Sequence, residues 1–294
     1  MEFVLTRDAE AFAAHVEGFL ADRIERNVLA TVLATVLAGV RGGRLGPAEP
    51  LFAFANGADG RPCAAALRTP PWPLLSSEIG LEEARRLMGS WLEHDPAVPG
   101  VSGVTSAARA VAASWTELTG ASSRLRMSNV LHVLTRVVGP PRPASGRLRG
   151  ARSDPAEREL LIAWERDFAA EADVTAAPDP ARAVDARLAS GAQLVWEDEG
   201  VPVCTLALAP QIAGTVRIGP VYTPPARRGR GYASSAVAAV SRGALARGAS
   251  RCVLFTDLAN PTSNKIYPSV GFRRCGDWEE HIFMPPVRAA ERLR

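Results

Sequence analysis

The stretch that decides the fold runs from Thr215 to Ala249 and reads TVRIGPVYTPPARRGRGYASSAVAAVSRGALARGA. Its first part, up to Thr223, is rich in β-branched residues and predicts a strand. Its last part, from Tyr232, is rich in alanine and predicts a helix. Between the two lies a basic loop, in which Arg227–Gly231 holds three arginines and two glycines. The function of this loop depends on the strand before it and the helix after it.

We expect the loop to hold a phosphate group. The first turn of a helix has unpaired backbone N–H groups and the positive end of the helix dipole, which together suit an anion. Gly229 and Gly231 tolerate positive φ and have no Cβ, so the backbone can approach a phosphate closely. Arg227, Arg228 and Arg230 add positive charge at the same point.

Other interpretations of the loop are weaker. The sequence has no GxxxxGK[ST] pattern, and Ser234 stands where the GxGxxG fingerprint needs its third glycine. An RNA-binding element of the RGG type needs several repeats, and there is one copy. A plain arginine–glycine turn without a ligand stays open as an alternative.

The composition indicates a globular protein of two domains. The chain has 294 residues, 47% of them hydrophobic and 22% charged. A formal net charge of +3 does not suit the whole chain to nucleic acid. The four cysteines are far apart and predict buried thiols in a reducing compartment. We predict no metal site.

Nothing in the sequence predicts a targeting or membrane segment. The first 20 residues carry charges throughout, unlike a signal peptide. The longest apolar run, residues 28–40, is too short to cross a bilayer and predicts a buried helix. We therefore expect a cytoplasmic protein that binds no membrane.

The same order of elements is expected twice, which indicates a tandem duplication; two unrelated α+β domains are the alternative. Each half reads as two helices, three strands, helix, strand, helix and strand. The first half is expected to hold helices within 8–39, strands 51–56, 63–68 and 73–78, helix 80–95, strand 100–104, helix 106–120 and strand 129–138. The second is expected to hold helices 154–172 and 179–191, strands 192–197, 201–209 and 215–223, helix 232–249, strand 251–257, helix 261–271 and strand 272–283.

Pro- and Gly-rich sequence separates the two halves. It predicts domains over 1–138 and 148–294, joined by a linker over 139–147.

Two motifs in the second half resemble the GNAT superfamily of N-acetyltransferases. RRGRGYAS is similar to motif A, (Q/R)-x-x-G-x-(G/A), with Arg228, Gly231 and Ala233 in the specified positions. NPTSNKIYPSVGF resembles the signature N-x-x-S-x-(K/R)-x-Y-x-x-x-G-F. Its matching residues are Asn260, Ser263, Lys265, Tyr267, Gly271 and Phe272. The resemblance covers roughly residues 148–283, and the first half shares only the order of elements.

The resemblance implies an α/β (α+β) fold of two tandem GNAT-like domains, each a mixed, mostly antiparallel sheet flanked by helices. It also implies acetyl-CoA as co-substrate. Its pyrophosphate would lie on the backbone of the loop and first helical turn, and its pantetheine arm along the preceding strand. Asn260 would bind that arm or cap the next helix, and Ser263 would reach the adenosine phosphates or face solvent. The implied binding residues are Val221, Tyr222, Thr223, Arg228, Gly229, Arg230, Gly231, Tyr232, Ala233, Ser234, Asn260 and Ser263.

Tyr267 is the implied catalytic residue. Transfer of an acetyl group to an amine leaves a thiolate, and a phenol can protonate it or donate a hydrogen bond to it. A tyrosine packed only for structure is the alternative. The general base stays unidentified. The acidic and histidine candidates are Glu197, Asp198, Glu199, Asp257, Glu279, Glu280 and His281. For the first three of these, a polar hairpin turn is the favoured interpretation.

The function implied is transfer of an acetyl group from acetyl-CoA to the primary amine of a small molecule or peptide, in a ternary complex. The alternative is a catalytically weak protein that binds acyl-CoA as a sensor or regulator. No nucleic-acid partner is expected, and the oligomeric state is not predicted. Four acidic residues between Glu165 and Asp173 suit either a cationic acceptor or a solvated helix face.

The first half is expected not to bind acetyl-CoA. The counterpart of the glycine loop, EIGLEEARRL, has one glycine and two adjacent glutamates, which repel a pyrophosphate. The counterpart of the Tyr267 helix carries Trp115 and no tyrosine. The expected role of this half is to pack against the second and to wall the acceptor site.

Overall fold

The computed structural model describes residues 2–22, 28–42, 49–140, 142–175, 177 and 179–284. Residues 23–27 of the first predicted helical stretch, Pro141 of the predicted linker and residues 285–294 of the predicted second domain lie outside this description. The chain divides into two compact units. One is Met1–Val130 together with Gly276–Arg294, and the other is Leu131–Cys275.

The order of elements predicted for each half is confirmed, with one short strand added at the start of each. The first half contains β1 (Phe3–Thr6), α1 (Ala9–Asp22), α2 (Val28–Arg41), β2 (Leu51–Asn56), β3 (Pro62–Arg68), β4 (Leu74–Ser76), α3 (Leu81–His94), β5 (Gly100–Val104), α4 (Thr105–Thr119) and β6 (Ser122–Leu134). The second contains β7 (Arg147–Gly150), α5 (Pro155–Glu171), α6 (Pro180–Ala189), β8 (Gln193–Asp198), β9 (Val201–Leu208), β10 (Thr215–Tyr222), η1 (Pro225–Arg227), α7 (Tyr232–Ala246), β11 (Arg251–Asp257), α8 (Ser263–Val270) and β12 (Arg273–Met284).

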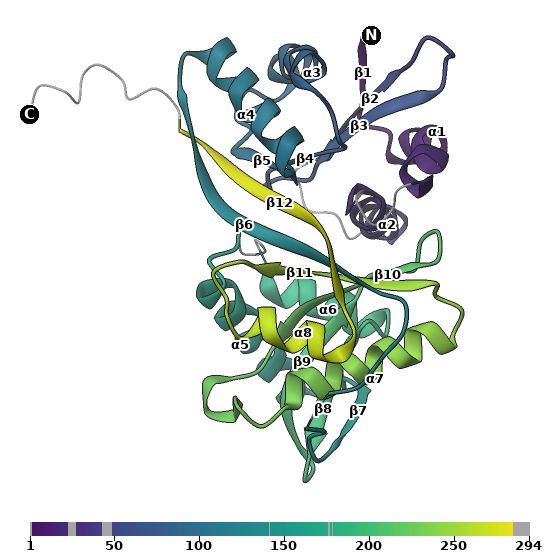
Figure 1. Ribbon diagram of the computed structural model, residues 1–294, viewed down its shortest axis with the longest axis vertical. Coiled ribbons are helices and arrows are strands. Elements are labelled where there is room, and N and C mark those ends of the chain that lie inside the picture. Colours follow the sequence, from purple (N-terminus) through teal and green to yellow (C-terminus); the bar gives the residue numbers. More distant parts are fainter. Residues whose placement is uncertain are drawn as a thin grey trace, which may run out of the picture. The chain divides into compact units, whose positions relative to one another are not determined.

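Each half builds a mixed, mostly antiparallel sheet with the same strand order. In the first unit β1 to β5 follow one another, and in the second β7 to β11 do the same. The fourth and fifth strands of each series are parallel, and the other pairs are antiparallel. Figure 1 shows the helices flanking these sheets. The α/β fold predicted from the sequence is therefore confirmed.

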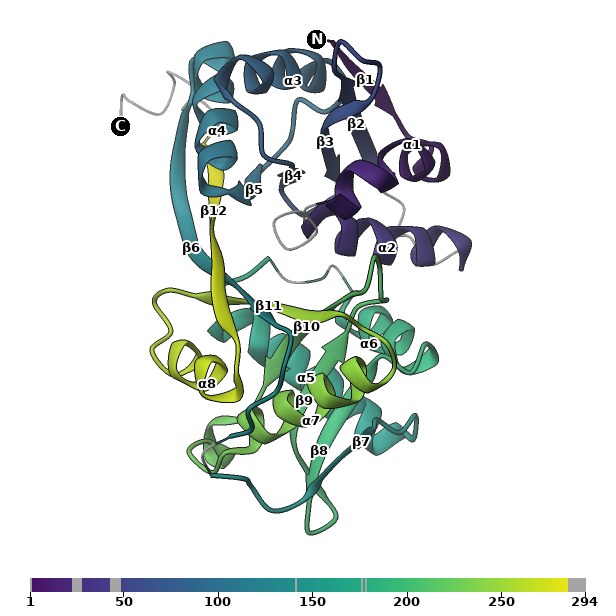
Figure 2. The same cartoon turned by 45° about the vertical axis from the view of Figure 1, so that its right-hand side comes forward.

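The two halves exchange their last strands. Residues 278–282 of β12 pair antiparallel with β5, in the first unit, although β12 closes the second half of the chain. The neighbour of β11 is β6, the last strand of the first half. β6 and β12 run side by side in both ribbon views (Figures 1 and 2). The predicted division into 1–138 and 148–294 stays a prediction. The compact units differ from it because this pairing places β12 from Gly276 onward with the first unit.

Helix packing follows the apolar periodicity of the sequence with one exception. The 3.6-residue spacing of its apolar residues predicts a buried face of α3 made of Leu81, Ala84, Leu87, Met88 and Trp91. The last four of these are fully shielded. Leu81 is 45% exposed, contrary to the prediction. It is the first residue of the helix, before the first turn has reached the core.

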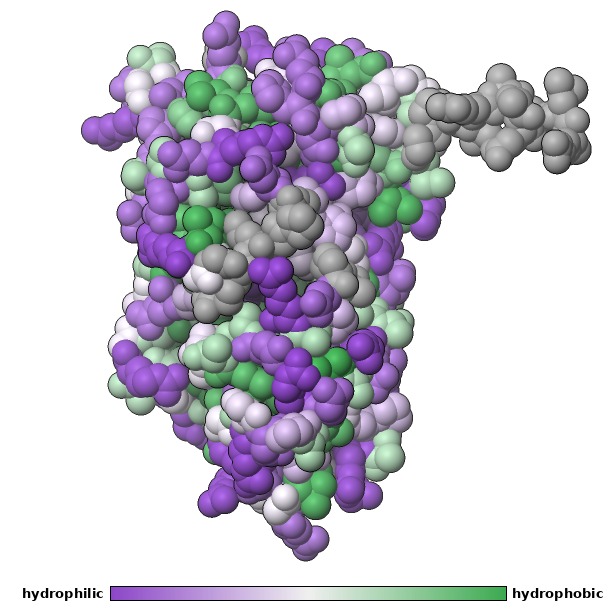
Figure 3. All heavy atoms as spheres, turned by 180° about the vertical axis from the view of Figure 1, so that it is seen from behind, coloured by the Kyte–Doolittle hydropathy of each residue, from purple (hydrophilic) through white to green (hydrophobic). Residues whose placement is uncertain are grey.

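In the second unit the sheet is covered on both faces. One core joins the α7 side of the sheet with α8, and another joins Val195 and Tyr222 with α5 and α6. Hydrophilic side chains cover most of the surface drawn in Figure 3, as expected when the apolar residues gather in such cores. Within the described ranges, no helix is long and apolar enough to cross a bilayer.

Candidate functional site

The loop after β10 has the backbone conformation that the two glycines predict. Gly229 has φ 76° and Gly231 has φ 80°, both in the left-handed region that favours glycine. Gly231 is the N-cap of α7 and provides no side-chain cap. By contrast, Asp154 and Asp179 cap α5 and α6 with their carboxylates. The first turn of α7 therefore presents backbone N–H groups of the kind that bind an anion.

The two glycines differ in what surrounds them. A Cβ on Gly231 would lie 2.9 Å from the carbonyl oxygen of Arg142, so both packing and φ require glycine there. A Cβ on Gly229 would meet nothing within 4 Å, so only φ is restricted. Open space beside Gly229 is where a phosphate could approach the backbone.

Arg228 is paired inside the protein. Its guanidinium forms an ion pair with Glu171 at the end of α5, and its Nε donates a hydrogen bond to the Thr223 carbonyl at 2.8 Å. The hydrogen bond from Arg228 is the main reason that the pKa of Glu171 is lowered. The two side chains are 48% and 41% exposed, and such exposed pairs stabilise a protein little. A phosphate can therefore compete with Glu171 for Arg228.

Tyr222 and Tyr232 use their hydroxyls in hydrogen bonds within the protein. Tyr222 donates to Glu171 at 2.8 Å, and burial raises its pKa to about 12. Tyr232 donates to Asp198 at 2.5 Å. Only the backbone of these two residues is left for a cofactor. The Ser234 hydroxyl is also used, because it donates to the Gly231 carbonyl at 2.9 Å.

β10 and β11 part at the point that leads to the loop. Their parallel register joins Thr215–Arg217 to Arg251–Val253, and no pairing between them continues beyond it in the described residues. On its other side β10 pairs with β9, with an irregularity between Ile218 and Val221. The residues after Ile218 therefore have an open edge toward β11. Extended backbone with an open edge can accept another chain of amides.

A buried polar atom lies at the end of this open edge. The Thr223 hydroxyl is shielded from water and has no hydrogen-bond partner. Its polar neighbour is the Cys204 thiol, and thiols are weak hydrogen-bonding groups. Burial raises the pKa of this thiol to about 12. Buried polar groups in proteins are usually satisfied, so this hydroxyl suits a polar ligand in the gap.

The α8 region brings together the residues of the second motif. The Asn260 Oδ1 accepts hydrogen bonds from the backbone N–H groups of Thr262 and Ser263, at 3.2 and 3.0 Å. Of its two predicted roles, the structure thus shows the cap, and binding of the pantetheine arm stays a prediction. Tyr267 is buried, and its ring lies edge-on to Phe272 at 5.9 Å. Burial raises the pKa of Tyr267, so its phenol stays protonated at neutral pH.

Asn264 was missed by the sequence analysis, because the family pattern leaves its position unspecified. Its Oδ1 accepts a hydrogen bond from Thr256 at 2.9 Å, and its Nδ2 donates to the carbonyls of Asp257 and Leu258. These contacts fix the turn between β11 and α8. Asn264 therefore sets the position of Tyr267, one turn further along the helix.

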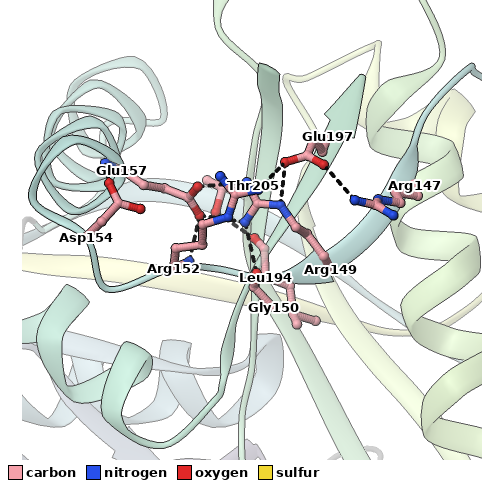
Figure 4. Close-up of polar contacts among 9 residues, drawn as sticks. All are labelled: Arg147, Arg149, Gly150, Arg152, Asp154, Glu157, Leu194, Glu197 and Thr205. Atoms are coloured by element: carbon pink, nitrogen blue, oxygen red, sulfur yellow. Dashed lines mark hydrogen bonds and ion pairs between the residues drawn. The ribbon is translucent and has the colours of Figure 1, made fainter. Parts of the chain in front are cut away.

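Three of the four predicted candidates for the general base in the second unit have carboxylates that already accept hydrogen bonds. Glu197 accepts them from three arginines (Figure 4). Asp198 accepts from Tyr232, and Asp257 accepts from the backbone N–H of Ala259 at 2.8 Å. The fourth, Glu199, is an exposed residue with φ 50° in the turn between β8 and β9. This position is typical of a polar turn residue.

The remaining candidates on β12 belong to the first unit. There Glu279 pairs with Arg109 and His281, and Glu280 pairs with Arg126. The base stays unidentified. The described residues also hold no group of three or more His, Cys, Asp or Glu arranged to bind a metal ion.

A protein-family comparison decides what this unit is. The model of the Acetyltransferase (GNAT) family matches residues 158–272. These residues form a GNAT domain. The match includes the glycine loop, the parted strands and α8, and its place in the second half is the one that the motifs predict.

Solved structures with the GNAT fold resemble nearly the whole chain. A GCN5-related N-acetyltransferase from Sphaerobacter thermophilus has a TM-score of 0.58 at 18% identity, covering 97% of this chain and 96% of its own. A GNAT-family acetyltransferase from Colwellia psychrerythraea has 0.55 at 10%, covering 96% and 99%. A tandem GNAT protein from the clavulanic acid biosynthesis pathway has 0.58 at 11%, covering 97% and 99%. At these identities the likeness shows the fold alone. No curated protein matches the sequence.

The corresponding helix of the first half differs from α7 in charge. α3 has Glu82 and Glu83 in its first turn, and the Glu83 carboxylate lies 2.8 Å from where a Cβ of Gly80 would be. A carboxylate at this place satisfies the helix dipole and repels a phosphate. The prediction that the first half binds no acetyl-CoA stays a prediction, and acetyl-CoA binding by a stable fragment of residues 1–140 would contradict it.

Proposed function

We propose that the GNAT domain binds acetyl-CoA and transfers its acetyl group to a primary amine of a small molecule or peptide. The observation that carries the proposal is the N-terminus of α7. It lacks a side-chain cap, follows two glycines with positive φ, and lies at the end of the strand that parts from β11.

The described residues fit acetyl-CoA in three respects. The backbone from Arg228 to Ala233 would hold the pyrophosphate, with open space at Gly229. The open edge around Val221–Thr223 would pair with the pantetheine amides, next to the unsatisfied Thr223 hydroxyl. Arg228 would exchange its contact with Glu171 for a phosphate. These assignments, and those of Asn260 and Ser263, are part of the proposal.

Acetyl-CoA supplies an acetyl group on a thioester, which is activated toward amines. The amine nitrogen bonds to the acetyl carbon, the carbon–sulfur bond breaks, and the sulfur takes up a proton. Tyr267 would give that proton, because its buried phenol remains protonated. The proton lost by the amine passes to water, since the buried carboxylates considered above are engaged.

A second candidate function is a sensor or regulator that binds acyl-CoA without efficient turnover. The sensor is favoured because most of the candidate carboxylates already accept hydrogen bonds, and no general base has been identified. The enzyme is favoured because the phenol of Tyr267 is protonated and can act as an acid.

Saturating acetyl-CoA is expected to raise the thermal unfolding midpoint of the protein. A ligand at 100 times its Kd adds about 2.7 kcal/mol to the stability of the folded state. For a unit of this size that corresponds to roughly 5 to 10 °C. Differential scanning fluorimetry with and without acetyl-CoA measures the shift.

Gly229→Glu is expected to abolish this shift, because its carboxylate would enter the space next to the loop backbone. Gly200→Glu is the matched control. Gly200 has φ 79°, and a Cβ there would likewise meet nothing within 4 Å, but it lies in the turn between β8 and β9. Both variants should lose similar stability without ligand. A wild-type protein without a shift, or an equal shift in both variants, would contradict the proposal.

A further inference from the structure

Arg217, in β10, is a charged residue whose role the site described so far leaves unexplained. Its Nε is shielded from water and has no hydrogen-bond partner. No ion pair or charged neighbour of Arg217 occurs in the part of the chain that the structure describes. Burial alone lowers its pKa. A guanidinium nevertheless remains charged in proteins, and this one has no acidic partner among the described residues.

Arginines elsewhere in the unit have acidic partners. Arg149 contacts Glu157 and Glu197, and Arg187 contacts Glu165 at 2.5 Å. Arg217 is only partly buried, but a shielded N–H group without a hydrogen-bond partner still costs stability. An arginine that keeps such an N–H group, among arginines that have acidic partners, therefore suits a negatively charged acceptor of hydrogen bonds supplied from outside the chain.

The place of Arg217 links it to the gap between the strands. It is opposite Val253 in the last position at which β10 and β11 pair. Its neighbours Val216 and Ile218 both point into the core on the α7 side, so alternation puts Arg217 on the other face of the sheet. Gly219 lies two residues further along, at the irregularity of β10, and a Cβ there would meet nothing within 4 Å. Open space thus lies next to Arg217 where the strands part.

The anion is not a phosphate of acetyl-CoA under the proposed function. The phosphates belong at Gly229–Ala233, beyond the other end of β10. Tyr222 lies five positions after Arg217 in β10, which is roughly 16 Å of extended chain. The acetyl end of the co-substrate carries no negative charge. The anion that reaches Arg217 must therefore belong to the acceptor.

We propose that Arg217 binds a carboxylate of the acceptor, so that the acceptors of this enzyme are amines that also carry a carboxylate, such as amino acids or peptides. A planar guanidinium fits a carboxylate through two parallel hydrogen bonds. The inference rests on the proposed function and narrows its substrate class. The acidic residues of α5 do not contradict it, since Glu165 and Glu171 are paired with Arg187 and Arg228.

The test compares each acceptor that carries a carboxylate with the same acceptor in its uncharged carboxamide form. L-amino acids and short peptides are assayed with acetyl-CoA beside their C-terminal carboxamides, using wild type, Arg217→Met and Arg217→Lys. Wild type should prefer the carboxylate form by about 100-fold in kcat/KM. Arg217→Met should reduce this preference to a few-fold by raising KM for the carboxylate form, and leave the KM of the carboxamide unchanged. Arg217→Lys should retain part of the preference, because lysine keeps the positive charge but cannot form the two parallel hydrogen bonds of a guanidinium.

Stability gives a second readout that does not depend on turnover. Without an acceptor, Arg217→Met should unfold at the same temperature as wild type or higher, because it removes a shielded N–H group that has no hydrogen-bond partner. A clear decrease would show a structural role and overturn the inference. A preference for carboxamides would also overturn it. So would a protein that binds acetyl-CoA but neither acetylates nor is stabilised by any carboxylated acceptor. Absence of acetyl-CoA binding would instead contradict the proposed function, and is measured separately.

Discussion

Tyr267→Phe is expected to lower kcat by about 100-fold or more and to leave the Kd for acetyl-CoA nearly unchanged. A positioned acid contributes roughly 10²- to 10⁴-fold to a reaction that releases a basic leaving group. The phenol of Tyr267 stays protonated because burial raises its pKa, so it can serve as that acid at neutral pH. Steady-state kinetics with the best acceptor, together with the acetyl-CoA-induced shift in unfolding temperature, measure both quantities.

The same variant separates the two proposed functions. Phenylalanine keeps the ring that packs edge-on against Phe272, so the fold and the cofactor site should persist. If turnover falls and acetyl-CoA binding remains, the enzyme is supported. If wild type and Tyr267→Phe bind acetyl-CoA equally and turn over at the same slow rate, the sensor is supported and Tyr267 has only a structural role.

The sequence predicted local structure well wherever a single residue restricts the backbone. Gly229 and Gly231 were expected to tolerate positive φ and have it. A helix was expected to begin at Asp154, and the Asp154 carboxylate accepts a hydrogen bond from the backbone N–H of Glu157. Such features depend on a few adjacent residues, so the order of elements could be read from the chain.

The exchange of final strands could not be predicted in this way. Both β6 and β12 read as strands at the end of a half, and nothing in their alternation specifies a partner. Sheet order depends on contacts between residues far apart in the chain, such as Glu279 with Arg109 and Trp278 with Ser102. The polar start of β6 was missed for a related reason: its side chains are largely exposed, so it lacks an apolar pattern.

The site was predicted in outline, and its contacts were not. The motifs located the loop and Tyr267. They could not show that Arg228 pairs with Glu171 or that Arg217 lacks a partner, because both facts depend on how α5 and the sheet pack. Glu197 had been weighed as a base or a polar turn residue. Its burial among three arginines makes it part of a structural network instead.

Arg149→Met is expected to destabilise the second unit by about 3 kcal/mol, the usual effect of removing one partner from a buried ion pair. Arg149 joins β7 to both β8 and α5: its Nη2 donates to Glu157 at 2.7 Å and its Nε donates to Glu197 at 2.6 Å (Figure 4). Both carboxylates are 5% exposed, so the variant would leave them shielded without their main partner. For a domain of this size the loss corresponds to roughly 6 to 12 °C in unfolding temperature.

Arg158→Met is the matched control, because Arg158 also makes two hydrogen bonds to one carboxylate, that of Asp185. These side chains are 31% and 48% exposed, and removal of such a pair should change stability little. The pH dependence provides a further check. The hydrogen bond from Arg149 lowers the pKa of Glu197, so its contribution is present above the unfolded carboxyl pKa and is lost as the pH falls. The difference in unfolding temperature between wild type and Arg149→Met should therefore shrink from pH 7 to pH 3. A gap independent of pH would mean that Arg149 stabilises the domain through packing of its aliphatic stem and not through its charge.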